Sequence, residues 1–385
     1  MPDEHVLATY DIGSFLPLEQ AAEVLAGEQS TGTFVRVPGE TDELRWRFGA
    51  KVVKVEALPD SGGESLPGAL RPPGGPPRPH RGTVRIAFPL ANFGPSLSNL
   101  LAAVAGNLFE LRELAAVKLT GLELPPAFAE RYPGPRYGIA GTRELTGVAR
   151  GPMIGTIVKP GVGLGLDALR VMVRELAESG IDFIKDDELT ADPPHAPLRE
   201  RVAVVTDELN RAADRTGHRP LYAFNITDDP DRLLANHDLV AEGGGRCVMV
   251  CAQIVGLGAV AQLRRHAALP IHGHRAMSGA LLRSPYVGLG AEAFAVLARL
   301  AGVDQLHAGG VRGKFYETDA SVRRSVDAIW RPFPVGFPGD YAALPVLSSG
   351  QWAGTAHAAY ELTGTDDLLV LAGGGIHGHP DGAAG

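Results

Sequence analysis

The chain has 385 residues, and 44 acidic against 36 basic side chains leave a formal net charge of −8. Nucleic-acid binders need clustered basic surfaces, so this acidic balance argues against that class of protein. Hydrophobic residues make up 45% of the chain without an apolar run long enough for a membrane span, which predicts a soluble globular protein. The length exceeds a single core of about 100–150 residues and predicts two domains or one large barrel with an appendage.

Neither the first residues nor the cysteines indicate a secreted protein. Asp3, Glu4 and Asp11 are atypical of a signal peptide. The two cysteines, Cys247 and Cys251, are too few for a disulfide framework or a four-thiolate zinc site. We expect a cytoplasmic protein in which both thiols are small buried side chains.

The first third of the chain mixes helical and strand-like segments. Good helix formers occupy residues 18–28, and a strand is expected over 31–37. The Gly/Pro-rich segment 61–82 predicts a loop, followed by a strand over 83–90 and a helix over 98–114. These elements predict a small α+β domain, and the row ERYPGPRYGI after it reads as a linker.

Beyond the linker the pattern becomes regular, with eight apolar segments of strand length. Each except the last is followed by a helical segment: 153–160, 181–188, 220–226, 246–252, 269–276, 303–310, 344–350 and 367–375. Such Val/Ile/Leu-rich strands alternating with helices predict a parallel sheet covered by helices, and eight units match a (β/α)8 barrel. We expect no eighth helix. A doubly wound sheet is the alternative.

The end of the second barrel strand carries a candidate metal site. Lys185 and Asp187 lie two residues apart and should share a face of the strand, with Glu188 just beyond. If CO2 carbamylates Lys185, the three side chains offer three oxygen ligands suited to Mg²⁺. The alternative is an ordinary salt-bridge cluster at a strand end.

Further polar residues and glycines follow the C-terminal ends of other strands, where barrels carry their active sites. They are Lys159, His272, His274, Arg275, His307, Lys314, Ser348, Gly350, Gly373 and Gly374. Glycine loops after the last two strands can bind phosphate through backbone N–H groups. The pair His272 and His274 leaves zinc open as another metal.

These motifs resemble a known family. GTIVKP, FIKDDE, HGHRAM, HAGGVRGK and AGGG, in this order, resemble the large subunit of RuBisCO, and EQSTGTF and AGNLFELRELAAVKLTGLELPPAF resemble its N-terminal domain. The resemblance spans nearly the whole chain. It implies an N-terminal α+β (ferredoxin-like) domain over residues 1–135 and a C-terminal TIM barrel over 136–385.

The resemblance also implies residue roles. Lys185, as a carbamate, would bind Mg²⁺ with Asp187 and Glu188. Lys159 would transfer protons, and His274 would contact a substrate hydroxyl or transfer a proton. Lys314 would be the mobile-loop lysine of the carboxylases. One phosphate end would be bound by Arg275, His307 and Ser348. The other would be bound by Gly350, Gly373 and Gly374, with Thr33 from a partner subunit. Glu28 and Asn107 would also reach the partner's site, which implies a homodimer or larger assembly without a small subunit.

The chain departs from the carboxylase pattern at several positions. A second lysine is replaced by Gly161, a tryptophan by Phe34 and a histidine by Ser278, and the C-terminal helix and tail are missing. The resemblance therefore implies a RuBisCO-like protein of the form IV type. The methionine-salvage enolases of this group carry a lysine where this chain has Asn107, which disfavours that branch.

From these residues we expect an Mg²⁺-dependent enzyme that enolises or isomerises a phosphorylated ketose-type sugar through an enediolate. The base would be the Lys185 carbamate or His274, and Lys159 would return the proton. Lys314 keeps open a decarboxylase, or residual carboxylase, of a phosphorylated sugar acid. A regulatory relic without catalysis is the third alternative.

Overall fold

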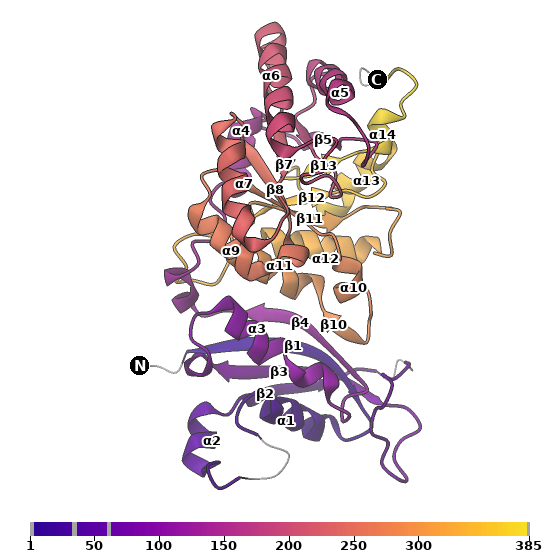
Figure 1. The fold of residues 1–385 in the computed structure, drawn as a ribbon. Coiled ribbons are helices and arrows are strands. Elements are labelled where there is room, and N and C mark those ends of the chain that lie inside the picture. Colours follow the sequence, from indigo (N-terminus) through magenta and orange to yellow (C-terminus); the bar gives the residue numbers. More distant parts are fainter. Residues whose placement is uncertain (1–3, 33–36, 60–62, 383–385) are drawn as a thin grey trace. The chain divides into compact units, whose positions relative to one another are not determined.

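Two units make up the fold of the protein. The structure is a computed structural model that describes residues 4–32, 37–59 and 63–382 (Figure 1). The first unit comprises Met1–Arg131, Ser278–Leu297 and Pro334–Pro338, and the second comprises the rest of the chain. The strand expected over residues 31–37 falls largely on 33–36, which lie outside the described residues. The domain boundary at residue 135 stays a prediction.

The first unit is built on a five-stranded sheet of order β10-β4-β1-β3-β2. Its strands are β1 (His5–Ser14), β2 (Lys51–Ala57), β3 (His80–Pro89), β4 (Ala116–Glu123) and β10 (Val287–Leu289). Strand β1 pairs antiparallel with β3 and β4, and β2 pairs antiparallel with β3. With helical crossovers after β1 and β3, this is the ferredoxin-like arrangement. Strand β10 adds a parallel fifth strand beside β4 that the sequence analysis did not foresee.

The helices of the first unit confirm one expected segment and correct another. They are α1 (Leu18–Glu28), α2 (Asp42–Phe48), α3 (Leu97–Ala105), α10 (Ser278–Leu282) and the 3₁₀ turns η1 (Leu90–Asn92), η2 (Asn107–Glu110) and η3 (Pro126–Glu130). Helix α1 has the predicted bounds. The helix predicted over 98–114 ends at Ala105 instead, because Gly106 leaves the helical region (φ −80°, ψ −116°). A β-carbon at Gly106 would lie 2.4 Å from the Ala102 carbonyl oxygen, so the break requires glycine.

The second unit is a closed parallel barrel of order β11-β12-β13-β5-β6-β7-β8-β9. Its strands are β5 (Met153–Ile157), β6 (Phe183–Lys185), β7 (Leu221–Asn225), β8 (Cys247–Cys251), β9 (Ile271–His274), β11 (Gln305–Gly309), β12 (Leu344–Leu347) and β13 (Leu369–Leu371). Each falls within one of the eight predicted segments. The barrel is confirmed, and the doubly wound alternative is wrong because β13 pairs with β5 and closes the sheet.

Apolar side chains from the barrel strands pack in the barrel interior. The buried cluster comprises Met153, Phe183, Leu221, Ala223, Cys247, Met249, Leu344, Val346, Leu369 and Leu371. Cys247 and Cys251 are free and buried, as expected. This packed layer closes the barrel interior, so polar chemistry is left to the C-terminal ends of the strands.

One helix, α4 (Gly138–Thr146), precedes the first barrel strand, and the others follow strands in the order that the sequence predicts. These others are α5 (Leu166–Glu178), α6 (Leu198–Thr216), α7 (Pro230–Glu242), α8 (Ala252–Val255), α9 (Leu257–His266), α11 (Ala291–Leu300, which begins in the first unit), α12 (Asp319–Trp330), α13 (Ala353–Thr363) and α14 (Gly374–His377). The expectation of no helix after the eighth strand is wrong, because α14 forms a single turn there. Among the described residues, no helix has the length and apolarity to cross a lipid bilayer.

Candidate active site

Lys185, the last residue of β6, is the most enclosed charged group at the mouth of the barrel. Its side chain is 1% exposed, and Nζ donates to the Asp186 carbonyl at 2.8 Å. Glu188 Oε2 lies 3.8 Å from Nζ. Burial lowers the pKa of the Lys185 amine, while the charges of Glu188 and Asp187 act in the opposite direction. A buried amine with a lowered pKa is more often neutral and nucleophilic.

Asp187 lies beside Lys185 and receives a second lysine from the neighbouring strand. Lys159, just after β5, forms a short ion pair with the buried Asp187 carboxylate, whose other oxygen accepts from the Leu189 N–H at 3.1 Å. Gly161 packs directly against this carboxylate. A β-carbon at position 161 would lie 2.8 Å from Asp187 Oδ2, so a lysine there would require Asp187 to move. The replacement of the carboxylases' second lysine thus has a steric counterpart in the structure.

Glu188 and His274 face each other across the mouth. His274 Nε2 lies 3.6 Å from Glu188 Oε2. His274 Nδ1 accepts the Ala276 N–H at 3.1 Å, so the ring proton of the neutral imidazole is on Nε2, toward Glu188. Burial, with the positive charge of Lys185, holds the pKa of His274 well below its ordinary value. The Cys251 thiol lies 3.9 Å from Nδ1.

Asp186 points away from the mouth and has no role among the predicted site residues. Its carboxylate accepts from Arg201 Nε at 3.1 Å, Tyr222 Oη at 2.6 Å and the Asn225 N–H at 2.8 Å. The Asn225 side-chain amide donates to the carbonyls of Asp187 at 3.0 Å and Glu188 at 3.3 Å. This cluster holds the backbone that carries the two acidic side chains. The alternation of strand faces predicts the outward direction of Asp186, but no local signal identifies its partners.

The HxH pair on β9 does not form a metal site with two free ring nitrogens. His272 is fully buried, and its Nδ1 and Nε2 lie 3.1 Å from Gln305 Oε1 and 2.8 Å from His307 Nε2. His307 Nδ1 lies 2.9 Å from Ser348 Oγ. Both His272 nitrogens are engaged, which disfavours the zinc alternative.

A second histidine cluster lies on α7 and α9. His237, Asp238 and His266 bring three potential ligand atoms within 4.8 Å of one another. His237 Nε2 accepts the Leu269 N–H at 3.3 Å, so Nδ1 carries the ring proton and donates it to Asp238 at 2.9 Å. No lone pair of His237 is free for a metal, and the cluster is a hydrogen-bonded link between two helices.

The glycine-rich loop after β11 is docked on the loop after β12. Lys314 N donates to the Ser349 carbonyl at 3.2 Å, and its exposed side chain lies with Nζ 5.3 Å from the centre of the Phe315 ring. Gly350 is close to Lys314, since a β-carbon at 350 would lie 3.3 Å from Lys314 N. The same loop supplies Glu317, which forms a short ion pair with Arg275. No local pattern predicts this partner, which neutralises the charge of Arg275, one of the residues expected to bind phosphate.

Gly373 and Gly374 lie at the start of α14, next to Lys159. A β-carbon at Gly373 would lie 3.9 Å from Lys159 Cε, whereas one at Gly374 would meet nothing within 4 Å. The structure therefore brings Lys159 close to both Gly373 and the Asp187 carboxylate.

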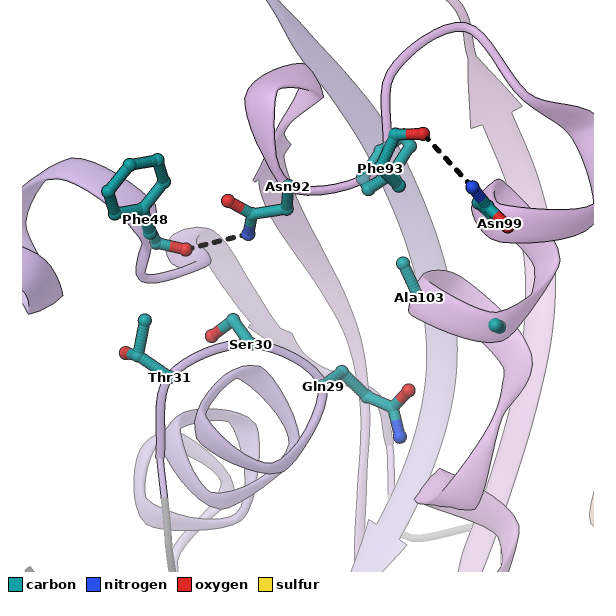
Figure 2. A pocket seen from close by; sticks show the side chains of 9 residues that line it. Gln29, Ser30, Thr31, Phe48, Asn92, Phe93, Asn99 and Ala103 are labelled. Atoms are coloured by element: carbon teal, nitrogen blue, oxygen red, sulfur yellow. Dashed lines mark hydrogen bonds between the residues drawn. The ribbon is translucent and has the colours of Figure 1, made fainter. Parts of the chain in front are cut away.

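Glu28 and Asn107 belong to the first unit, where both side chains are exposed. Gln29 joins the segments that carry them. With its amide oxygen turned toward the N–H groups, Gln29 accepts from Asn107 N at 3.1 Å and Leu108 N at 2.9 Å and donates to the Ala103 carbonyl at 2.9 Å. Figure 2 shows Gln29 and Ala103 at a pocket of about 480 Å³ that Asn92 and Asn99 also line. Thr33 lies outside the described residues.

The donor set at the barrel mouth fits Mg²⁺ and a lysine carbamate. Lys185, Asp187 and Glu188 project from one strand end, and the buried amine of Lys185 is the kind that reacts with CO2 when neutral. The resulting oxygens would match the preference of Mg²⁺ for hard ligands. Lys159 is the counter-ion of the Asp187 carboxylate in this structure, so Mg²⁺ and Lys159 would have to share that carboxylate.

Family models match both parts of the chain. The model for the ribulose bisphosphate carboxylase large chain, catalytic domain, covers residues 138–385, and the model for its N-terminal domain covers residues 1–128.

Named relatives cover almost the whole chain. A 3-oxo-isoapionate-4-phosphate transcarboxylase/hydrolase of Xanthobacter autotrophicus is 47% identical over 98% of this chain and 90% of its own length. A 3-oxo-isoapionate-4-phosphate decarboxylase of Rhizobium etli is 41% identical over 98% and 90%.

Solved structures show the same fold. The rubisco-like protein from Burkholderia fungorum has a TM-score of 0.91 and 43% identity, covering 99% of this chain and 91% of that one. The dimeric Rubisco from Hyperthermus butylicus has a TM-score of 0.85 and 27% identity over 100% and 88%.

Proposed function

Because this chain belongs to the ribulose bisphosphate carboxylase large-chain family as a RuBisCO-like protein, we propose that it cleaves a carboxyl group from a phosphorylated 3-oxo sugar acid. The resulting enolate, or enediolate, would then be protonated on carbon. Support comes from the two relatives named above, which act on 3-oxo-isoapionate 4-phosphate. Decarboxylation therefore becomes the first candidate reaction, and isomerisation becomes the second.

The observation that carries the proposal is the cluster at the barrel mouth. Lys185, Asp187 and Glu188 would hold Mg²⁺, which supplies a positive charge that stabilises negative charge on the substrate's oxygen atoms. In decarboxylation the bond between the carboxyl carbon and the α-carbon breaks, and its electron pair moves into the neighbouring ketone. No base is needed for this step. A proton donor is then needed for the α-carbon.

One group of this chain is suited to return that proton. Lys159 is exposed enough to exchange protons with solvent and forms an ion pair with Asp187. His274 directs its Nε2–H toward Glu188, and because a neutral imidazole does not readily release this proton, His274 can act there as a hydrogen-bond donor. Lys314, in its exposed loop, is the cation that can interact with the carboxyl group before it leaves.

The charges at the two ends of the site favour a ligand with one phosphate. Lys159 and the glycines Gly373 and Gly374 form an end with an N–H-rich turn and a cation. At the other end, Glu317 neutralises Arg275. A second phosphate would have to displace that carboxylate, so the glycine end is the better anion site.

Isomerisation remains the second candidate because His274 is a neutral, buried imidazole near a metal ligand. Burial lowers its pKa, so the ring stays neutral, and Nδ1 would be the basic nitrogen once it gives up the Ala276 N–H. In that reaction a substrate C–H proton, and no carboxyl group, would leave.

One assay separates the two reactions. The protein is incubated with Mg²⁺, CO2 and 3-oxo-isoapionate 4-phosphate, and CO2 release is measured together with deuterium incorporation in D2O. We expect CO2 release with one deuteron in each product molecule. Exchange into a panel of phosphorylated ketoses without CO2 release would instead support isomerisation.

Ribulose 1,5-bisphosphate serves as the counter-substrate. We expect no incorporation of labelled CO2 into 3-phosphoglycerate, because Gly161 packs against Asp187 and leaves no room for the second lysine. Robust incorporation would contradict the proposal.

We also propose a homodimer in which Glu28 and Asn107 complete the partner's site. A mixed dimer of Asn107→Ala and Lys185→Ala chains tests it. If sites are shared, one site carries both lesions and the other neither, so up to about half of the wild-type activity per dimer should return. The homodimers of each variant are the controls and should be inactive. If verified heterodimers are also inactive, the shared site is refuted.

A further inference from the structure

A line of buried polar side chains runs from helix α4 to the end of β12. In spatial order it consists of Thr142, Gln305, His272, His307 and Ser348, all buried. Neighbours along the line lie 3.0, 3.1, 2.8 and 2.9 Å apart. Each of these distances is that of a hydrogen bond, so every contact needs one donor and one acceptor.

The direction of the line is decided at its Thr142 end. Thr142 Oγ1 lies 2.6 Å from the Gly138 carbonyl oxygen. A carbonyl has no proton, so the hydroxyl proton of Thr142 must lie in this contact. Thr142 can then only accept from Gln305, which therefore turns its amide Nε2 toward Oγ1.

This amide orientation determines the proton positions in both histidines. Gln305 presents Oε1 to His272 Nδ1, so Nδ1 must carry a proton. Burial holds the pKa of His272 and of His307 well below the ordinary value, so each ring is neutral and has one proton. His272 Nε2 then accepts from His307 Nε2, and His307 Nδ1 accepts from the Ser348 hydroxyl.

We propose that Thr142 and Gln305 are positioning residues that commit the Ser348 proton to His307, so that Ser348 meets a bound ligand as a hydrogen-bond acceptor. An acceptor binds a hydroxyl group of a sugar-like ligand, whereas the oxygens of a phosphate dianion offer no proton. The same holds for His307, whose two ring nitrogens are both engaged. Only the presence of a ligand at Ser348 rests on the proposed function.

The group of the substrate that binds at His307 and Ser348 is then a different one from that expected. His307 and Ser348 were expected to bind phosphate with Arg275, and the direction of the line instead favours a hydroxyl group there. Together with the Arg275–Glu317 pair, this leaves the glycine end for the anion.

Neutron diffraction from deuterium-exchanged crystals of the ligand-free protein reads these positions directly. We expect deuterons on His272 Nδ1, His307 Nε2 and Ser348 Oγ, the last pointing to His307 Nδ1. A deuteron on His272 Nε2 or on His307 Nδ1 would overturn the proposal. The map does not depend on turnover, so failure to act on a sugar phosphate leaves this result intact, and the reverse also holds.

Two variants of Thr142 test the origin of the direction. Thr142→Val keeps the shape but removes the acceptor, so the Gln305 amide can take both orientations, and the His272 deuteron should divide between Nδ1 and Nε2. Thr142→Ser keeps the hydroxyl and should retain the wild-type pattern. An undivided His272 deuteron in Thr142→Val, or a divided one in Thr142→Ser, would refute the role of Thr142. If Thr142→Val does not fold, the wild-type map still decides the direction.

Discussion

Two carboxylates adjacent in the chain, at the end of β6, have opposite surroundings. Asp186 faces outward, and the protein itself satisfies its oxygens through Arg201, Tyr222 and Asn225. Asp187 faces the barrel mouth, where a lysine and one backbone N–H are the partners that the structure shows. Because successive residues of an extended segment point to opposite sides, one residue separates a structural carboxylate from a candidate metal ligand.

The functional side of this segment can be recognised from the partners of its charged groups. A buried charge whose partners are all supplied by the chain contributes to the fold. Near Asp187, by contrast, two lysines and two carboxylates lie together, and the ion pair between Lys185 and Glu188 is long, at 3.8 Å. Substitutions on the Asp187 side of the segment can therefore be tested with the Asp186 side as the control.

The largest effect is expected from Lys185→Ala. Loss of the carbamate ligand should remove Mg²⁺ binding and lower turnover by about 100-fold or more, since a metal stabilises transition-state charge by several kcal/mol. Magnesium titration by calorimetry and steady-state assays measure this. Near-UV circular dichroism should be unchanged, because the outward cluster is intact. Unchanged turnover would remove the metal mechanism.

Asp186→Asn and Asp187→Asn should divide stability from metal binding. Asp186→Asn leaves the buried guanidinium of Arg201 without its counter-ion and should reduce the free energy of unfolding by about 3–5 kcal/mol. Asp187→Asn leaves a half-exposed Lys159 that water can solvate, so stability should change little while Mg²⁺ affinity falls. Urea denaturation with and without Mg²⁺ measures both, and equal destabilisation would contradict the distinction.

A smaller effect is expected at Gly161. Gly161→Ala places a β-carbon 2.8 Å from the Asp187 carboxylate, so Mg²⁺ affinity should fall by about tenfold, equivalent to about 1.4 kcal/mol. Gly165→Ala is the matched control, because its β-carbon would meet nothing within 4 Å and its φ is −75°. Equal Mg²⁺ affinities of the two variants would show that Asp187 moves aside without cost.

The smallest effect concerns the pH dependence of activation by CO2. Burial lowers the pKa of Lys185, and only the neutral amine reacts with CO2. Activation at a constant CO2 concentration should therefore rise with pH through this lowered pKa and level off below the pH at which an ordinary lysine titrates. Rates measured after preincubation at each pH, then assayed at one common pH, test this. A rise that continues to the ordinary lysine pKa would contradict it.

Much of the fold follows from local patterns. The eight strands were predictable because buried parallel strands are continuous apolar segments, and α1 because its helix formers recur without a break. The helix over 98–114 was mispredicted because the apolar pattern continues beyond Gly106, although a glycine after a helical run is a local stop signal. Strand β10 escaped prediction because three residues carry little pattern, and its pairing with β4 joins segments about 170 residues apart.

The barrel and the gathering of Lys185, Asp187 and Glu188 could be predicted because they depend on residue types at short spacings. The family and its ferredoxin-like domain could be predicted because the motifs resemble those of a known family. What each group faces could not be predicted, because it depends on the tertiary structure. Gly161 against Asp187, Glu317 on Arg275 and the directed line from Thr142 to Ser348 join residues far apart in the chain. Hydrogen bonds and steric contacts act over a few ångströms of space, and no local pattern records which distant atoms arrive within that range.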